Sequence, residues 1–294
     1  SRPPRRRLGP GSRRLFEMGF FAALALVPLL AASPATLDPF PTATSPPLFP
    51  GARSVLWVGA HPDDEVLLAP VLAKLCLLER LDCHLLVLTR GEAGICLLPG
   101  GCQPNLADVR TIEMQQSAAL LGAELTLWNL PDGGGTAGWS AASGGHSALV
   151  SRLASFLQAL APDVVLSFDP RHGSTCHGDH KAAAELVVEA HAGLDAQPAV
   201  FFLETRAAVN ATPPFVAYAP AASASAGAFG YPATIDVGDS YGTWSYSALA
   251  AGLHPSQFGP ETVRALRRMP GTQRVVYLAP APGALADDDV YSCP

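Results

Sequence analysis

A histidine and three carboxylates follow one another at the end of an apolar run in the first quarter of the chain. The segment reads AHPDDE, and its ionisable side chains are His61, Asp63, Asp64 and Glu65. Like charges this close repel one another and lose solvation when they are buried. A divalent cation would compensate them, because it binds carboxylates directly and stabilises neighbouring ones through its field. The segment therefore predicts one half of a metal site.

A second pair of histidines lies further along the chain, in the segment HGDH. His177 and His180 stand three residues apart, just before a segment with helical spacing. Three nitrogen and oxygen ligands with one open position are typical of a catalytic zinc centre. We assign His61, Asp64 and His180 as ligands of Zn²⁺, or of another divalent metal such as iron or cobalt. His172 is an alternative to His177 or His180, although its surroundings, DPRHGS, resemble a turn.

Three polar residues beside these ligands are candidates for catalytic roles. Asp63 would act as general base and take a proton from the attacking water. His177 would stabilise the negative charge on a carbonyl oxygen or protonate the leaving amine. Asp179 would hold the His177 ring in place, or it would only cap the following helix. Together these groups predict metal-assisted hydrolysis of an amide or an ester.

Two further residues are candidates for substrate binding. Arg110 and Glu113 are three residues apart in a segment with helical spacing, so they share a face. They form either a solvated ion pair of small energetic value or a part of the site from which Arg110 binds substrate hydroxyls. Asp132, in the segment LPDGG, either binds a hydroxyl or makes a turn. His84 lies inside a predicted strand and is expected to be structural.

Apolar strands and helical segments alternate along the part of the chain that carries these residues. The predicted strands cover residues 54–60, 83–89, 124–130, 163–169 and 199–205, and the predicted helices cover residues 64–80, 105–122, 147–160 and 181–191. The alternation predicts an α/β, Rossmann-like fold with a mostly parallel sheet and helices on both faces. Ligands bind such sheets at the carboxyl ends of the strands. The polar clusters AHPDDE, TRGEAG, PDGG and DPRHGSTCHGDH all follow strands, which places the site there.

Composition limits the organisation of the chain and its partners. The chain has 294 residues, 49% of them hydrophobic and 15% charged, enough for one large core or at most two domains. Six of its 19 basic residues lie within residues 1–14, which leaves 13 basic against 25 acidic residues in the remainder. This balance argues against a nucleic-acid partner, because such partners need a basic surface.

The first 35 residues resemble an export signal. A basic stretch precedes the apolar run MGFFAALALVPLLAA and a group of small residues, and SRRLF resembles a twin-arginine motif. An ordinary secretory signal and a short membrane anchor are alternatives, although the run is short for a membrane span. We expect an export signal at 1–35, an extended leader at 36–52 and one hydrolytic domain at 53–294. The mature protein would be extracellular or periplasmic, without a stable membrane span.

The six cysteines fit an exported protein. They form no CxxC pair, which disfavours a structural zinc site. Cys96 and Cys102 flank the segment LLPGG and are predicted to form a disulfide. Cys76 lies on an apolar helical stretch and is interpreted as a buried thiol.

The motifs of this chain resemble those of the PIG-L/LmbE family of zinc-dependent de-N-acetylases. The resemblance rests on AHPDDE, TRGEAG, RTIE followed by LLGAE, LPDG and HGDH, and more loosely on IDV and HPSQF near the end; it covers roughly residues 54–260. It implies a Rossmann-like fold and removal of acetyl groups from N-acetylglucosamine-type substrates, or cleavage of related amides. It also implies zinc ligation by His61, Asp64 and His180, the base role for Asp63, and the oxyanion or acid role for His177.

The sequence departs from the family pattern at three places. The insertion at residues 96–108 adjoins the predicted pocket and is expected to alter its mouth. A lysine that relatives often carry before the closing His-x-x-Gln is absent near residues 245–247, and Thr175 stands where some thiol-sugar deacetylases carry a tyrosine. These differences concern the substrate rather than the hydrolytic chemistry.

The sequence thus predicts an exported zinc hydrolase that removes an acetyl group from an amino sugar or glycoconjugate, such as an N-acetylglucosamine derivative. An amidase of non-sugar N-acyl substrates is an alternative with the same chemistry. A non-catalytic protein that binds a metal or a carbohydrate is an alternative of a different class.

Overall fold

The computed structural model describes residues 47–203, 234–236, 243–269 and 275–280. The predicted export signal, the leader up to residue 46, the last two residues of the predicted strand 199–205 and the last residue of IDV lie outside this part of the chain. Within the described residues, no helix is both long and apolar enough to cross a membrane.

Five parallel strands form the centre of the sheet, as the sequence predicts. They are β1 (Ser54–Gly59), β2 (Asp82–Thr89), β3 (Glu124–Leu130), β4 (Val164–Phe168) and β5 (Ala199–Leu203). Their order is β3-β2-β1-β4-β5, and β1 pairs with both β2 and β4, so Leu56 lies between His84 and Val165. Two antiparallel strands that the sequence did not indicate extend the β5 side, namely β7 (Val275–Pro280) and then β6 (Thr234–Asp236).

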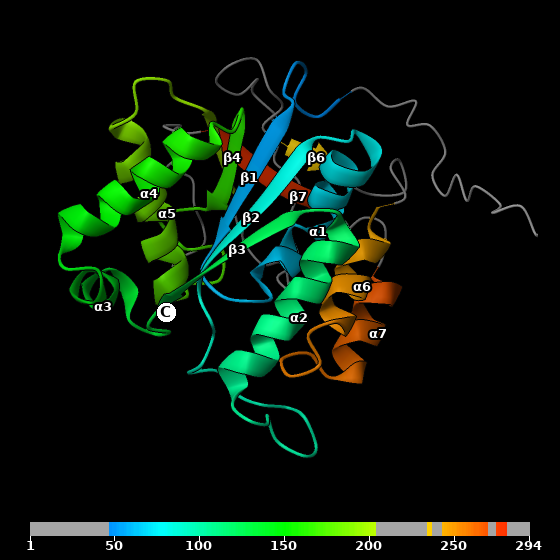
Figure 1. Ribbon diagram of the computed structural model, residues 1–294. Coiled ribbons are helices and arrows are strands. Elements are labelled where there is room, and N and C mark those ends of the chain that lie inside the picture. Colours follow the sequence, from blue (N-terminus) through cyan, green and yellow to red (C-terminus); the bar gives the residue numbers. More distant parts are fainter. Residues whose placement is uncertain (1–46, 204–233, 237–242, 270–274, 281–294) are drawn as a thin grey trace, which may run out of the picture. The chain divides into compact units, whose positions relative to one another are not determined.

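Helices cover both faces of the sheet (Figure 1). One face carries α3 (Gly135–Ala142), α4 (His146–Leu160) and α5 (Gly178–Ala192). The other carries α1 (Ala69–Ala73), α2 (Leu106–Leu121), α6 (Ser245–Gly252) and α7 (Pro260–Arg268). This arrangement confirms the Rossmann-like prediction, because right-handed connections between parallel strands place helices on both sides.

Helix boundaries follow local chemistry. The Asn105 side chain accepts a hydrogen bond from the Asp108 amide at 2.9 Å and caps α2, which ends at Gly122 with φ 67°. The predicted helix at 64–80 is instead broken into a 3₁₀ turn η1 (Asp64–Leu67), α1 and a π-helical turn η2 (Lys74–Leu78). Pro70 lies at the start of α1, where its missing amide hydrogen leaves no hydrogen bond unmade.

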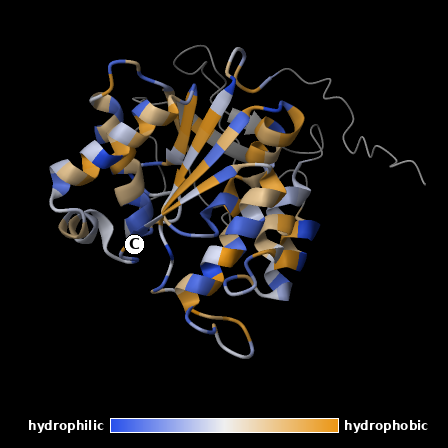
Figure 2. Ribbon diagram, viewed as in Figure 1, coloured by the Kyte–Doolittle hydropathy of each residue, from blue (hydrophilic) through white to orange (hydrophobic). Residues whose placement is uncertain are grey.

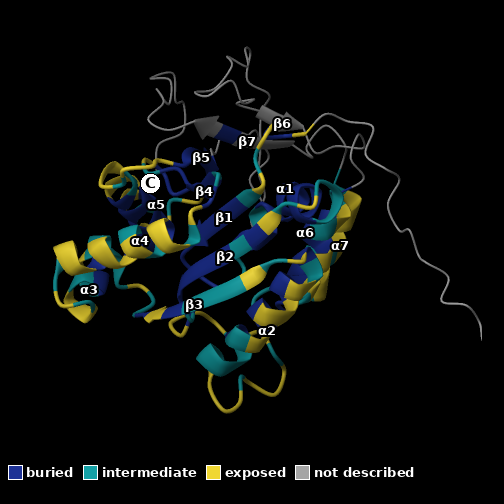
Figure 3. Cartoon of the chain, turned by 45° about the horizontal axis from the view of Figure 1, so that its top comes forward, coloured by how far each residue is buried: buried dark blue, intermediate teal, exposed yellow. Residues whose placement is uncertain are grey.

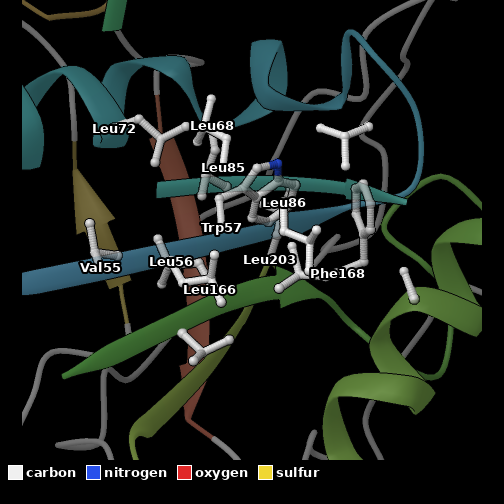
Figure 4. Packing of buried hydrophobic residues seen from close by; sticks show 14 of the residues in the cluster. Val55, Leu56, Trp57, Leu68, Leu72, Leu85, Leu86, Leu166, Phe168 and Leu203 are labelled. Carbon is white, nitrogen blue, oxygen red and sulfur yellow. The ribbon is translucent and has the colours of Figure 1, made fainter. Parts of the chain in front are cut away.

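The core lies on both faces of the central strands. Figure 2 shows these strands as mostly hydrophobic, and Figure 3 shows β1 and β2 as buried along most of their length. Trp57 on β1 is completely buried and meets the Phe168 ring edge-on at 5.0 Å between centroids, with Leu85, Leu86 and Leu203 close by (Figure 4). Strands packed on both faces bring their polar carboxyl ends to one edge, where the candidate site lies.

Two disulfides lie within the described residues. The predicted pair Cys96–Cys102 is confirmed. The interpretation of Cys76 as a free buried thiol is wrong, because Cys76 in η2 is joined to Cys83 at the start of β2, with 5.7 Å between their Cα atoms. The sequence shows two cysteines seven residues apart, but only the return of the chain from helix to strand brings them together.

We expect Leu153→Ala to lower the free energy of unfolding by about 2–5 kcal/mol, because Leu153 on α4 is completely buried and its loss leaves a cavity. The matched control is Leu249→Ala on α6, whose side chain is 41% exposed and whose loss should cost less than about 1 kcal/mol. Urea denaturation of both variants measures the difference. Equal losses would contradict the packing described for α4.

Candidate active site

Four loops at the carboxyl ends of the parallel strands supply the polar side chains of the site. The segment after β1 carries His61, Asp63 and Asp64, and the segments after β2 and β3 carry Gly91 and Asp132. The segment after β4 leads into α5 and carries the residues around His180. The neighbouring positions of β1 and β4 in the sheet bring the first and last of these loops together.

The turn after β1 is organised by Asp64. Its Oδ2 atom accepts hydrogen bonds from the amides of Ala60 and His61, both at 2.7 Å. Gly59 is required beneath this turn, because a Cβ atom there would lie 2.9 Å from the Trp57 indole nitrogen and 3.3 Å from the Asp64 Cβ atom. These contacts leave Oδ1 of Asp64 to face the centre of the site.

Three ligand-type atoms converge at that centre. Nε2 of His180 lies 3.0 Å from Oδ1 of Asp64 and 3.2 Å from Nδ1 of His61, and Nδ1 of His61 lies 3.7 Å from Oδ1 of Asp64. Nitrogen and oxygen ligands about 2.0–2.1 Å from a tetrahedral zinc ion are about 3.3 Å apart. The triangle therefore has the dimensions that such an ion requires.

The outer ring nitrogens determine where the lone pairs of both histidines point. Nδ1 of His180 lies 3.0 Å from the carbonyl oxygen of Gly173, which can only accept, so this nitrogen carries the proton. Nε2 of His61 lies 3.0 Å from Asp132 and 3.2 Å from Asp179, and it donates to these carboxylates in the same way. In its neutral form each ring thus directs the lone pair of its inner nitrogen at one point, as in metal-binding histidines.

The charges around this point shift the pKa values of its residues. Burial opposes protonation of His61, but the carboxylates of Asp64, Asp132 and Asp179 outweigh it and hold the pKa of His61 well above its usual value. Burial likewise opposes ionisation of Asp64, but His180 and His61 hold the pKa of Asp64 well below its usual value. The pocket therefore favours positive charge at the place where the three ligand atoms meet.

Asp63 lies next to this triangle in an unusual backbone conformation. Its φ is 118°, in the region that favours glycine, and its Oδ1 atom forms an ion pair with Nη2 of Arg110 at 3.0 Å. Burial raises the pKa of Asp63 to about 6, against the opposing effect of Arg110. The Asp63 carboxylate is 18% exposed, so water can reach it.

Two alternatives were open for Arg110, an ion pair with Glu113 and a place at the site, and the structure supports the second. Arg110 is buried and reaches the site, where it also donates to the carbonyl oxygens of Pro62 and Gly91. Gly91 is necessary for this approach, since a Cβ atom there would lie 2.2 Å from Nη1 of Arg110. Glu113 instead accepts from the amide and hydroxyl of Ser256 at 3.0 and 2.6 Å.

The structure also corrects the expected partner of Asp179. Its carboxylate accepts from the amides of Gly133 and Gly135 and contacts His61, and it does not hold the His177 ring. Asp179 is not the helix cap either, because α5 begins at Gly178 and His177 caps it by accepting the Asp179 amide at Nδ1. A prediction from neighbours in sequence failed here because the helix turn directs the carboxylate toward β3.

His177 lies at the exposed side of the site. Its ring centroid is 4.7 Å from that of His61 and 5.0 Å from that of His180. Burial and the two neighbouring rings lower the pKa of His177, which keeps it neutral near pH 7. Because Nδ1 accepts a hydrogen bond from the Asp179 amide, the proton of neutral His177 is on Nε2.

Other sets of ligand-type side chains also lie close together in the described part of the chain. One is His61, His177 and His180, and another is His61, Asp132 and Asp179, each with ligand atoms within 4.8 Å of one another. His172 belongs to neither; its Nδ1 lies 3.4 Å from Asp169, whose carboxylate accepts backbone amides of the turn that the sequence indicated. His84 pairs with Thr126 on β3, away from these sets, as expected.

A family model described as PIG-L, GlcNAc-PI de-N-acetylase, matches residues 56–191 of this chain. Residues 56–191, slightly less than half of the chain, are thus similar to the PIG-L family. This segment contains all eight residues that we selected from the sequence for catalysis, substrate binding and metal binding. It does not contain α6, α7 or the residues between them.

Two individual proteins that are similar to this chain are named as deacetylases. A 1D-myo-inositol 2-acetamido-2-deoxy-α-D-glucopyranoside deacetylase 3 of Catenulispora acidiphila is 28% identical over 160 residues, which are 46% of this chain and only 44% of that protein. An N,N'-diacetylchitobiose deacetylase from Pyrococcus horikoshii has a TM-score of 0.59 and 20% identity, and the match covers 80% and 85% of the two chains.

A second similar structure shows that the fold alone does not decide the reaction. GalB, a 4-carboxy-2-hydroxymuconate hydratase from Pseudomonas putida, has a TM-score of 0.56 and 17% identity, over 80% of this chain and 99% of that one. Function must therefore be argued from the site.

One pair of residues behind the site, Glu65 and His254, was not predicted from the sequence. Glu65 was noted only as a charge, but it is completely buried and holds His254, which lies 189 positions later. Glu65 raises the pKa of His254 above its usual value, although burial opposes protonation. The apolar residues around Glu65 could have indicated that its charge is buried, but nothing in the sequence names its partner.

We expect His180→Ala to weaken zinc binding more than about 100-fold, because it removes an atom of the central triangle. His177→Ala is the matched control and should retain about one zinc ion per chain. Elemental analysis after dialysis, with circular dichroism to verify folding, measures both. If His177→Ala lost zinc as completely as His180→Ala, the set with three histidines would be the binding site instead.

Proposed function

We propose that this chain is a zinc-dependent hydrolase that removes an acetyl group from an amino sugar, such as an N-acetylglucosamine derivative. The observation that carries the proposal is the triangle formed by His61, Asp64 and His180, with its lone pairs aimed at one point and the Asp63 carboxylate beside it. The names of the Catenulispora relative and the Pyrococcus neighbour, both deacetylases of acetamido sugars, support the choice of substrate class.

The chemistry of the ligand set fits zinc. Two imidazole nitrogens and one carboxylate oxygen, with an open fourth position, are the ligands of catalytic zinc sites. When bound, the ion supplies a Lewis acid that polarises a carbonyl group and makes water more acidic. Asp132 and Asp179 would keep His61 in the tautomer that binds the metal, and the Gly173 carbonyl would do so for His180.

Asp63 is the general base in this proposal. Its carboxylate is accessible to water, and a pKa of about 6 leaves it ionised at neutral pH but basic enough to accept a proton. Arg110 fixes one carboxylate oxygen by its ion pair. The other oxygen is thereby directed to the attacking water.

His177 acts on the carbonyl oxygen and the leaving amine. Its Nε2–H group can donate to the oxygen on which negative charge develops, because Nδ1 is already occupied by the Asp179 amide. The C–N bond then breaks, the amine takes up a proton, and acetate is released. Asp63 has gained one proton from water, so the proton required by the amine is available within the site.

Arg110 and Asp132 remain our predicted residues for binding substrate hydroxyls. Asp132 accepts from His61 through Oδ1 and from the Ala93 amide through Oδ2 at 2.8 Å. Each carboxylate oxygen has a second lone pair, so Asp132 can still accept a sugar hydroxyl. Arg110 would contribute its charge from beneath Asp63.

We also propose that the protein is exported. The basic and apolar residues at 1–35 support this, and so do the disulfides Cys76–Cys83 and Cys96–Cys102, since disulfides persist in oxidising compartments. Mass spectrometry of the mature N-terminus in cell and secreted fractions tests the proposal. An unprocessed N-terminus found only in the cytoplasmic fraction would reject it.

A screen for acetate release tests the proposed activity. Zinc-loaded protein is incubated with N-acetylglucosamine, its glycosides and N,N'-diacetylchitobiose, and in parallel with N-acetyl amino acids. Acetate and free amine from the sugars alone support the amino-sugar deacetylase. Release from the amino acids alone favours the amidase, and zinc binding without release from any compound favours a binding protein.

We expect Asp63→Asn to lower kcat by about 10²–10⁴-fold while zinc content is unchanged, because the amide cannot accept the proton of water. Asp82→Asn is the matched control, since Asp82 is exposed at the start of β2, and it should keep the wild-type rate. Steady-state kinetics on the best substrate of the screen measures both. A wild-type rate for Asp63→Asn would show that another group is the base.

A further inference from the structure

A completely buried carboxylate lies directly behind the proposed base. Glu65 has no exposed surface, and its Oε2 atom accepts a hydrogen bond from the backbone amide of Asp63 at 3.1 Å. The Asp63 backbone has φ 118° and ψ −12°, a conformation that costs a non-glycine residue about 1–3 kcal/mol unless surrounding contacts hold it. The amide–carboxylate hydrogen bond is such a contact.

The other oxygen of Glu65 is held by two distant elements. Nε2 of His254, between α6 and α7, donates to Oε1 of Glu65 at 2.7 Å, and the hydroxyl of Ser117 on α2 donates to the same oxygen at 2.5 Å. His254 is also completely buried. A carboxylate without solvent must keep such donors, because an unpaired buried charge is strongly destabilising.

The segment that carries His254 also holds the helix from which Arg110 reaches the base. Ser256 donates its amide and hydroxyl to Glu113 on α2, one helical turn after Arg110. Asp63 is thus supported from two sides by contacts with residues 254–256. Arg110 fixes its carboxylate, and Glu65 fixes its backbone amide.

We propose that His254 is a positioning residue of the reaction, which holds the Glu65 carboxylate so that it fixes the backbone of Asp63. This inference rests on the proposed function, in which Asp63 is the base. The hydrogen bond to Glu65 orients the Asp63 peptide plane and sets its φ, and φ sets the direction of the Cβ atom and of the carboxylate. His254 touches neither the ligand triangle nor the space for the substrate, so its effect should appear in kcat and not in zinc content or KM.

Two substitutions distinguish the effect of losing the hydrogen bond from His254 to Glu65 from the effect of changing the side-chain volume. In His254→Gln the side-chain amide can still donate to Glu65 from a similar distance, whereas the shorter side chain of His254→Asn cannot. We expect His254→Asn to lower kcat by about 10²-fold, the usual effect of a misplacement near 1 Å, with KM and zinc content unchanged. His254→Gln should recover most of this loss. Leu249→Ala on α6, whose side chain is 41% exposed and takes no part in these contacts, is the control and should keep the wild-type kcat.

A second measurement does not depend on activity. The amide proton of Asp63 donates to a carboxylate, so its NMR resonance reports this bond directly. His254→Asn should move that resonance upfield and speed its hydrogen exchange, while His254→Gln and Leu249→Ala should leave both unchanged. If His254→Asn does not fold, Ser117→Ala replaces it, because it removes the other donor to Oε1 of Glu65 and should move the resonance in the same direction.

The outcomes distinguish this inference from the proposed function. An unchanged Asp63 resonance in a folded His254→Asn or Ser117→Ala variant overturns the positioning role, whatever the enzyme does. A moved resonance with unchanged kcat overturns it as well, because the backbone would then not matter to the reaction. If the wild-type protein releases no acetate in the screen, the proposed function fails, whereas the resonance still shows whether His254 holds Asp63 through Glu65.

Discussion

The site depends on the pairing of β1 with β4, because this pairing brings together side chains that would otherwise repel. The loop after β1 supplies His61 and Asp64, and the loop after β4 leads to His180. Two ring nitrogens with inward lone pairs lie 3.2 Å apart, with a carboxylate oxygen 3.0 Å from one of them. Such a group is stable only with a proton or a cation at its centre. The fold brings these three atoms close together, and their lone pairs and negative charge then favour the binding of a cation.

Two carboxylates behind the ligand atoms fix the orientation of the His61 ring. Asp132 comes from the loop after β3 and Asp179 from the first turn of α5, and they meet at the same nitrogen of His61. Asp179 is fixed in turn by the amides of Gly133 and Gly135. Three loops thus determine the orientation of one imidazole ring.

The sequence predicted the parts of the molecule that local pattern determines. The parallel strands were found as apolar runs, and α2 was found between its capping residues Asn105 and Gly122, because both depend on nearby residues alone. Helix α3 was missed because its glycine-rich start resembles a loop, α6 because its apolar periodicity is weak, and β6 because it is only three residues long. The partner of Asp179 was predicted wrongly, because a neighbour in sequence was taken for a neighbour in space.

The buried pair of Glu65 and His254 shows why such a site cannot be read from one motif. Glu65 stands in the same six-residue segment as the metal-type residues, yet its carboxylate faces away from them, toward a histidine 189 positions later. Alternation of side chains around a tight turn forces this division, so that Asp64 faces the centre while Glu65 enters the core. A carboxylate in the core needs buried donors, and here Ser117 on α2 and His254, which follows α6, supply them. The strained backbone of Asp63 is therefore held, through Glu65, by a histidine from a distant part of the chain, which links the packing of α6 and α7 to the position of the base.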